Sequence, residues 1–477
     1  MKTLSVRFLV FFVFAASCTF AQSDAYSSRS INRDGEKMVW KNSNGVSSFN
    51  VEMRGKIELN DDDSDIKSMS SDGYLEITKT VFGSKRSLVI TPQAGGLKRE
   101  YYEGRTSIPY EPEGRKWMSE IMPELVRTTT IGAESRVNRF FKQGGVNSVL
   151  SQISSMESDY VKHHYANLLM GISGVAQKDY PNIINKVAGT MDSDYYLAEF
   201  LQKNLNKFLT TKEATDAVFA ATTKMESDHY KTEVIKEALR SQSASPEAIK
   251  SILEASSKME SDHYKTEVLT SLMKQSNLTD ATISDMINAS KSIESDHYKT
   301  QVLTKALAKP GLSATSYQRV LESVKDIDSD HYKTEVLTDL LKNKLPTDQI
   351  FNLVELSTYI ESDHYLTIVY NEVMKNQDLS DDAFKKLIER AANVDSDHYA
   401  SSILRSALAL PGMNDAKLTS ILTAAGNIES DHYITEVLTA AAPKVKTSGA
   451  MVKDAYRLAA KKIESETYYG RALRAVE

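Results

Sequence analysis

Residues 293–303 read Ile-Glu-Ser-Asp-His-Tyr-Lys-Thr-Gln-Val-Leu, and close copies of this stretch recur through the second half of the chain. The tetrapeptide Ser-Asp-His-Tyr occurs seven times and contains seven of the nine histidines. The aspartates of successive copies are 34, 34, 34, 33, 34 and 34 residues apart. A fixed period of this length is typical of stacked supersecondary units, so the repeat decides the fold.

Each copy carries one aspartate, one histidine and one tyrosine, and these residues form the structural repeat motif of the chain. They are Asp228, His229, Tyr230, Asp262, His263, Tyr264, Asp296, His297, Tyr298, Asp330, His331, Tyr332, Asp363, His364, Tyr365, Asp397, His398, Tyr399, Asp431, His432 and Tyr433. Degenerate copies extend the series upstream to Asp194 and Asp159 and downstream to Glu466. In the copy at Asp194 a tyrosine replaces the histidine, so histidine is an optional addition to the motif.

Two apolar stripes in each repeat predict two amphipathic helices. Counted from the aspartate, offsets +6, +7, +10 and +11 are nearly always apolar, as in Val268, Leu269, Leu272 and Met273. This spacing is typical of a helix with one buried face. The tyrosine at offset +2 lies one turn before the stripe, so we expect its ring to face the core. The second stripe is illustrated by Leu418, Ile421, Leu422, Ala425 and Ile428.

Prolines fall between the two predicted helices, at Pro246, Pro310, Pro346 and Pro411. Since proline interrupts helices, each repeat should be two antiparallel helices joined by a short loop. Stacking about nine to ten such hairpins over residues 151–477 would give a continuous core, which predicts an α-solenoid. The period equals that of the tetratricopeptide repeat, but the residues differ, and the units look more like short HEAT-type hairpins.

Residues 37–111 have a different pattern, in which apolar and polar side chains alternate between short glycine turns. A period of two with such turns predicts an antiparallel β domain, so the fold class is α+β. From Pro112 onward helical spacing takes over, and residues 112–150 are expected to form linking or capping helices. The alternating segments are residues 51–59, 74–80, 87–91 and 97–102.

The first 21 residues are typical of a secretory signal peptide, with Lys2 and Arg7 before a short apolar segment at residues 8–16. The protein is therefore expected to be secreted or periplasmic. Cys18 either leaves with the signal or, in a sequence that loosely resembles a bacterial lipobox, becomes a lipid anchor. Residues 22–36 are polar and Ser-rich, which predicts a disordered linker, and no later stretch is long enough to span a membrane.

Ordinary structural roles account for most of the repeat motif. Serine is a strong N-cap residue, and an aspartate in the first turn complements the helix dipole. Capping and packing explain the histidine of the motif least well. Stacking of the repeats should align the seven imidazoles in a ladder along one edge. We expect each histidine to bond the aspartate of the adjacent repeat or a backbone carbonyl. The alternative is a metal-binding array that uses the Asp-His-Tyr ladder.

Several classes of function are disfavoured. The net charge of −6, with both signs interspersed, does not resemble a nucleic-acid-binding surface. There is no phosphate-binding loop or His-Glu-x-x-His helix, and equivalent repeats offer no single asymmetric pocket. We therefore expect no catalytic residue, no metal, no cofactor and no enzymatic activity. The acidic run at residues 60–65 has Ile66 and Asp72 where an EF-hand needs Gly and Glu, so we expect a solvated loop.

Both parts of the chain resemble a bacterial pair of modules of unclear function. Residues 50–59, the acidic turn and the Gly-Gly-Leu-Lys-Arg-Glu-Tyr segment at residues 95–101 look like an extracytoplasmic β domain. In relatives this domain is followed by a linking helix, matched here by residues 117–127, and by Ser-Asp-Tyr-type helical repeats. Some such pairs are attached to membrane metallopeptidases of the β-lactam-sensor type. The resemblance implies extracytoplasmic sensing or scaffolding and transfers no catalytic residues.

The second helices of the repeats diverge, whereas the first helices from Asp228 to Asp330 are nearly identical. Variety from unit to unit is useful on a binding face, while the junctions must keep one geometry. We therefore predict that a protein partner in the cell envelope contacts outward positions of the second helices, represented by Glu247, Lys250 and Lys325.

Overall fold

The computed structural model describes residues 28–34, 37–241 and 243–477. The chain divides into two compact units, one ending at Ala214 and one running from Thr215 to Glu477. The first unit contains a β domain and the first helices of the array, and the second contains the remaining helical repeats. Within these described ranges, no helix is both long and apolar enough to cross a membrane.

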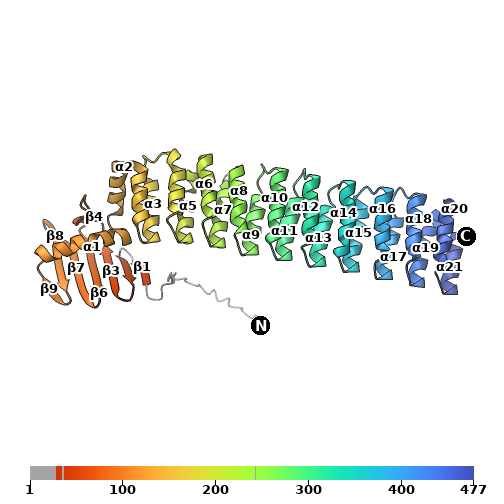
Figure 1. Cartoon of the computed structure of the whole chain (residues 1–477), viewed down its shortest axis with the longest axis horizontal. Coiled ribbons are helices and arrows are strands. Elements are labelled where there is room, and N and C mark those ends of the chain that lie inside the picture. The colour runs from red at the N-terminus through yellow and green to blue at the C-terminus, as the bar shows by residue number, and fades with distance from the viewer. Residues whose placement is uncertain (1–27, 35–36, 242) are drawn as a thin grey trace, which may run out of the picture. The chain divides into compact units, whose positions relative to one another are not determined.

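The β domain is built on a seven-stranded antiparallel sheet in the order β1-β2-β3-β6-β7-β8-β9, with β4 and β5 as a separate pair (Figure 1). Alternate residues such as Val51, Ile77 and Leu88 are fully buried, and they share a core with Trp117 and Ile121 of α1. The predicted β domain is confirmed. The elements are β1 (Ser28–Asp34), β2 (Lys37–Ser43), β3 (Ser47–Arg54), β4 (Ile57–Leu59), β5 (Ile66–Met69), β6 (Tyr74–Val81), β7 (Ser84–Gln93), β8 (Gly96–Glu103), β9 (Thr106–Ile108), η1 (Tyr110–Gly114) and α1 (Arg115–Thr128).

One segment of the predicted linker is a strand. Ser28–Asp34 pairs antiparallel with Lys37–Ser43 along its whole length, so the prediction of a disordered linker over residues 22–36 is wrong for this part. The pairing uses main-chain N–H and C=O groups, which every residue of the segment carries, so a polar segment can extend a sheet edge without an apolar pattern. The predicted signal peptide and Cys18 lie outside the described residues.

Helices of the first unit already form repeat hairpins. α2 packs against both α3 and α4, so the helical array begins before residue 151, within the predicted linking segment. α2 is kinked at Gly144 and Gly145, where Gly145 has a φ of 62°. The elements are α2 (Ala133–Ser155), α3 (Asp159–Gly171), η2 (Gln177–Asp179), α4 (Tyr180–Ala188) and α5 (Asp194–Phe208). The division between the units falls within α6 (Lys212–Thr222).

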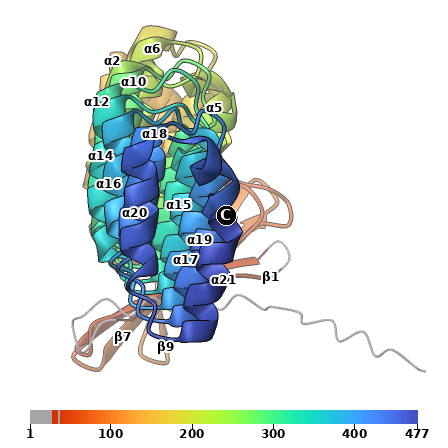
Figure 2. The same ribbon diagram turned by 90° about the vertical axis from the view of Figure 1, so that its right-hand side faces the viewer.

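The second unit is a two-layered helical array, in which first helices pack on first helices and second helices on second helices (Figure 2). The first helices are α7 (Asp228–Ser241), α9 (Asp262–Leu272), α11 (Asp296–Leu307), α13 (Asp330–Leu340), α15 (Asp363–Asn376), α17 (Asp397–Leu408), α19 (Asp431–Thr447) and α21 (Glu466–Val476). The second helices are α8 (Pro246–Ser257), α10 (Asp280–Ala289), α12 (Ala314–Val324), α14 (Thr347–Leu356), α16 (Asp381–Ala391), α18 (Asp415–Ala425) and α20 (Ala450–Ala460), and short turns η3 (Ser290–Ser292) and η4 (Ser357–Tyr359) follow two of them.

The predicted apolar stripes form the core between the two layers. Val268 and Leu272 of a first helix are completely buried, as are Ile421 and Leu422 of a second helix. Pro246 lies in the first turn of α8, where the missing N–H is harmless. The prediction of an α-solenoid of helical hairpins is therefore confirmed, and its period places every repeat motif at the start of a first helix.

Candidate functional site

The aspartate of the motif links each repeat to the next. Asp330 Oδ2 accepts hydrogen bonds from the backbone N–H groups of Glu361 at 2.9 Å and Ser362 at 2.7 Å. The same bond to the serine of the next motif occurs at seven aspartates of the second unit, with N···O distances of 2.7–2.9 Å. In the first unit Asp159 binds Ser193 in the same way. We call this arrangement the aspartate clamp.

The serines of the motif do not use their side chains as caps. Ser295 and Ser329, for example, stand at the N-cap position, but neither hydroxyl accepts a cap hydrogen bond. The predicted capping role is therefore wrong for the motif serines from Ser261 to Ser430, whose backbone N–H groups are held instead by the preceding aspartate. Side-chain capping occurs instead at the second helices, at Ser245, Thr279, Ser313, Ser380 and Asn414.

A buried lysine accompanies the clamp at offset +3 in five repeats. In one of them, Lys333 Nζ donates to Asp330 Oδ1 at 3.2 Å and to the carbonyl of Tyr359 at 2.7 Å, just after the second helix of the same repeat. The ammonium thus neutralises the clamp and satisfies a carbonyl at a helix end. Sequence reasoning missed this role, although the shared His-Tyr-Lys-Thr segment contains the signal. The five are Lys162, Lys231, Lys265, Lys299 and Lys333.

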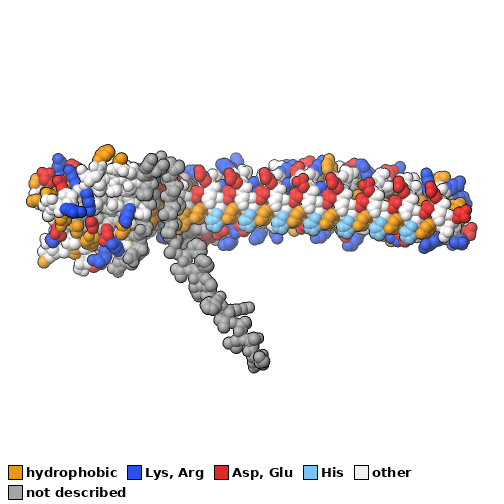
Figure 3. Space-filling view, turned by 90° about the horizontal axis from the view of Figure 1, so that it is seen from below, with side chains coloured by type: hydrophobic (Ala, Val, Ile, Leu, Met, Phe, Trp, Pro, Cys, Tyr) orange, Lys and Arg blue, Asp and Glu red, His pale blue; other side chains and the backbone are white. Residues whose placement is uncertain are grey.

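The histidines and tyrosines of the motif form an unbroken line of rings along the second unit, from Tyr230 to Tyr468 (Figure 3). Each histidine ring centroid lies 5.0–5.3 Å from the following tyrosine and 5.6–6.0 Å from the tyrosine of the next repeat. All seven histidines are exposed and the tyrosines are half-buried. We call this surface the ring line.

Two expectations for these rings are wrong. The tyrosine lies at the surface between two imidazoles rather than in the core, because the helix core begins one turn later. The histidines do not bond the aspartate of the adjacent repeat, because that carboxylate is occupied by backbone N–H groups. Instead, the hydroxyls of Tyr264 and Tyr332 lie 3.4 Å from Nδ1 of His229 and His297. The predicted ladder of imidazoles itself is present.

The geometry offers little to a metal ion. Throughout the described ranges, no three His, Cys, Asp or Glu side chains converge as a group that could hold one. Zinc requires three or four ligands that converge at about 2.0–2.3 Å. On the ring line a tyrosine separates each histidine from the next, so neighbouring imidazoles do not share a centre. The metal-array alternative therefore gains no support from this arrangement.

Two further histidines lie on α3 of the first unit. Burial lowers the pKa of His163, a residue that is 9% exposed; the nearby carboxylate of Glu199 acts in the opposite direction, and Lys203 adds a smaller lowering. Burial also lowers the pKa of His164, with smaller contributions from His163 and Lys203. Both imidazoles are therefore held in the neutral form more strongly than a histidine in water.

The acidic run before β5 is held by arginines. Asp63 pairs with Arg136 at 3.0 Å and with Arg139 at 2.7 Å, and both arginines belong to α2. Asp65 pairs with Arg99 of β8 at 3.1 Å. The prediction of a solvated loop is wrong for these two aspartates, because the partners come from distant parts of the sequence. The run fastens the β domain to the first helices.

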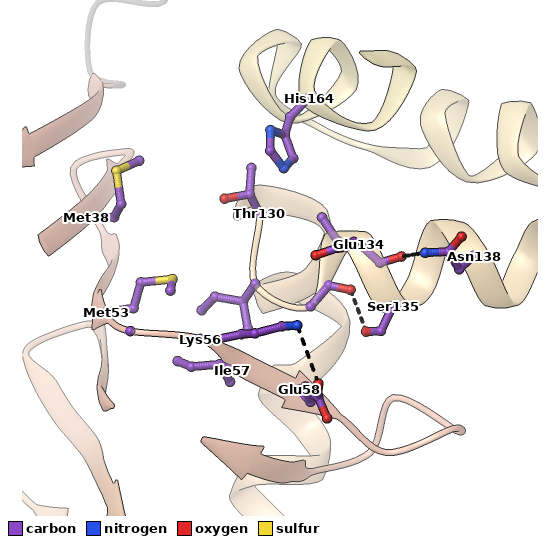
Figure 4. Close-up of a pocket in the computed structure, with 14 residues that line it drawn as sticks. Met38, Met53, Lys56, Ile57, Glu58, Thr130, Glu134, Ser135, Asn138 and His164 are labelled. Carbon is purple, nitrogen blue, oxygen red and sulfur yellow. Dashed lines mark hydrogen bonds and ion pairs between the residues drawn. The ribbon is translucent and has the colours of Figure 1, made fainter. Parts of the chain in front are cut away.

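An open cavity of about 430 Å³ lies in the first unit between the β domain and the helices (Figure 4). Met38 and Met53 line it from the sheet, and His164 lines it from α3. Lys56 and Glu58 form an ion pair at its wall, 3.9 Å apart. Ser135 and Asn138 of α2 also line it, and their side chains donate to the backbone carbonyls of Gly132 and Glu134.

The predicted partner-binding residues are on the surface of the second helices. Glu247 and Lys250 are exposed on α8, and Lys325 is exposed at the end of α12. Lys325 Nζ lies 5.9 Å from the ring centroid of Tyr359, which is 51% exposed. The structure thus separates two surfaces of the array, the ring line at the starts of the first helices and this variable surface on the second helices.

No protein-family model and no curated protein matches the chain. One similar solved structure is titled "Computational Design of Self-Assembling Cyclic Protein Homooligomers"; it is 12% identical, with 67% of this chain and 93% of that chain covered and a TM-score of 0.13. Another, "Circular tandem repeat protein with novel repeat topology and enhanced subunit contact surfaces", is 11% identical, with 77% and 78% covered and a TM-score of 0.15. Likenesses this weak do not indicate what this chain binds.

Proposed function

We propose that this protein is a non-enzymatic, extracytoplasmic scaffold that binds another protein through the outward surface of its second helices. The observation that carries the proposal is the contrast between the two helical layers. The first-helix starts repeat one geometry, fixed by the aspartate clamp, whereas the second helices expose different charges from unit to unit. A repeat array is compatible with such binding, since its stacked units present an extended surface.

Tyr359 and Lys325 provide the best anchor on this surface. Large aromatic side chains that are exposed in the free protein are enriched among residues that dominate binding energy. Tyr359 is among the few large apolar side chains of the described chain that are more than half exposed. The ammonium of Lys325 over its ring holds a cation beside the aromatic surface. We place the centre of the partner contact here.

The extracytoplasmic location rests on the sequence. Residues 1–21 have the pattern of a secretory signal, and the two modules resemble extracytoplasmic ones. An alkaline-phosphatase fusion placed after residue 36 would be active only if the leader directs export. Inactivity of the fusion, with a matched active control that carries an established leader, would contradict the location.

Binding can be tested by crosslinking pull-down of the tagged full chain from the envelope fraction. We expect the captured partner to be lost when Glu247, Lys250 and Lys325 are reversed in charge together. The matched variant changes His263, His297 and His331 to Gln and should keep the partner. Both variants should retain the helical circular dichroism of the parent. Capture that survives the charge reversals but is lost in the histidine variant would contradict the assignment to the second helices.

A further inference from the structure

In the six repeats from Asp262 to Asp431, an exposed carboxylate lies two residues before the clamp aspartate. None of these side chains forms an ion pair with another residue that the structure describes, so the row is a line of uncompensated negative charge. Figure 3 shows acidic side chains recurring beside the ring line. The row consists of Glu260, Glu294, Asp328, Glu361, Asp395 and Glu429.

The aspartate clamp fixes the spacing of this row. The backbone N–H of Glu260 donates to Asp228 at 2.8 Å, and that of Glu294 donates to Asp262 at 3.0 Å. The clamp therefore positions the acidic residue together with the serine that starts the next first helix. Charges and rings repeat with the same period, which is the spacing of neighbouring helices, about 8–10 Å.

Carboxylates and rings share one surface. His229, Tyr264 and Glu260 line the same open depression between two repeats. Lys224 and Lys258 also line it, and the ammonium of Lys258 is paired with Glu254 at 2.8 Å. A molecule that lies along the ring line would therefore meet aromatic rings and, from Glu260 to Glu429, an exposed carboxylate at each step.

We propose that this edge of the array binds an extended, basic peptide segment in the polyproline II conformation. This segment has three residues per turn and rises about 3.1 Å per residue, so one turn spans about 9.3 Å and matches one repeat. Aromatic surfaces receive prolines of such segments, and a Lys or Arg at every third position faces the carboxylate row. A β-strand rises about 3.3 Å per residue with a period of two, which does not match. Nucleic acid would be repelled by the row.

This site uses other residues than the second-helix contact and does not depend on the proposed scaffold function. Its test uses the full chain and a fluorescently labelled peptide of Pro-Pro-Lys triplets, one triplet for each rung from His229 to His432. Anisotropy should show saturable binding that strengthens with the number of triplets, because each rung adds a contact. Matched peptides replace Lys by Glu, which reverses the charge, or Pro-Pro by Gly-Ser, which keeps the charge but removes the preformed conformation. Both should bind at least about tenfold more weakly.

Protein variants assign the binding to the acidic row. Changing Glu260 and Glu294 to Gln and Asp328 to Asn removes three charges and leaves the clamp N–H groups in place. We expect about tenfold weaker binding and a smaller dependence on salt. Charge reversal of Glu247 and Lys250, in the first turns of α8, should leave peptide affinity unchanged.

Three results would overturn the proposal. The first is equal affinity for the Pro-Pro-Lys and Gly-Ser-Lys peptides, which would reduce the interaction to bulk charge. The second is full affinity in the triple acidic variant. The third is displacement of the peptide by a neutral β-linked oligosaccharide, which would assign the ring line to sugar stacking.

Discussion

The aspartate clamp should couple neighbouring repeats, and Asp330→Ala tests this. The change removes an acceptor of two backbone N–H groups and leaves the ammonium of Lys333 without its counter-ion. A hydrogen bond to a charged group contributes about 1.5–3 kcal/mol, so the two bonds set an upper range of about 3–6 kcal/mol. The Asp330 side chain is 16% exposed, and water can reach the freed N–H groups in part. We therefore expect a loss of about 3 kcal/mol in the free energy of unfolding.

Urea unfolding of the full chain, followed by circular dichroism, measures this loss. Because repeats are stabilised by nearest-neighbour contacts, the variant should also unfold over a broader range as the array separates at the weakened junction. Asp330→Asn keeps an acceptor oxygen and should cost about 1 kcal/mol. Asp378→Ala is the matched surface control, since the Asp378 side chain is 92% exposed in its pair with Lys344, and it should cost less than about 0.5 kcal/mol.

Two outcomes would refute the reasoning. If Asp330→Ala costs under about 1 kcal/mol, the clamp bonds are replaced by water at no loss. If the Ala and Asn variants are equally destabilised, the accepted hydrogen bonds are not what the carboxylate contributes.

Three further predictions concern other parts of the array. Ser313→Ala should cost about 1 kcal/mol of unfolding free energy because its side chain caps α12, whereas Ser329→Ala should cost under about 0.5 kcal/mol; equal losses in urea unfolding would contradict the two roles. Tyr298→Ala should cost about 1–2 kcal/mol, as for a half-buried ring, and a loss above about 3 kcal/mol would restore the core interpretation. Lowering the pH from about 7.5 to 5 should destabilise the fold, because burial lowers the pKa of His163 and His164 and the unfolded chain then binds more protons than the folded chain. The urea midpoint of a variant with both histidines changed to Gln should depend less on pH. An unchanged pH dependence in that variant would show that these two histidines are not its source.

The helical array could be predicted because its core follows from local spacing. Leu269, Leu303 and Leu337 occupy one offset of the repeat, and all three are buried. Period alone identifies such positions, since a helix brings every third or fourth side chain to one face. The β domain could be predicted for the same reason, because side chains of a strand alternate between the two faces of a sheet with a period of two residues.

The clamp could not be predicted in the same way. Asp262 is 32 and 33 residues before the N–H groups that it accepts, so the contact exists only once the repeats have stacked. Local rules favour Ser295 as a cap, but those rules do not include a carboxylate from the preceding repeat that already binds its N–H. The arginines around Asp63 and the pairing of β1 were missed for the same reason, since both depend on tertiary neighbours.

Comparison among the repeats shows which positions of the motif the junction between repeats requires and which positions it does not require. Asp363 and Asp397 keep the clamp although Leu366 and Ala400 replace the lysine at offset +3, so the aspartate alone is sufficient for the junction. The histidine takes no part in any clamp, and the copy at Asp194 is clamped to Asp159 without one. The exposed imidazoles, and the side-chain carboxylates of the row from Glu260 to Glu429, thus contribute nothing that the junction requires. We therefore assign these two positions to the proposed peptide site rather than to folding.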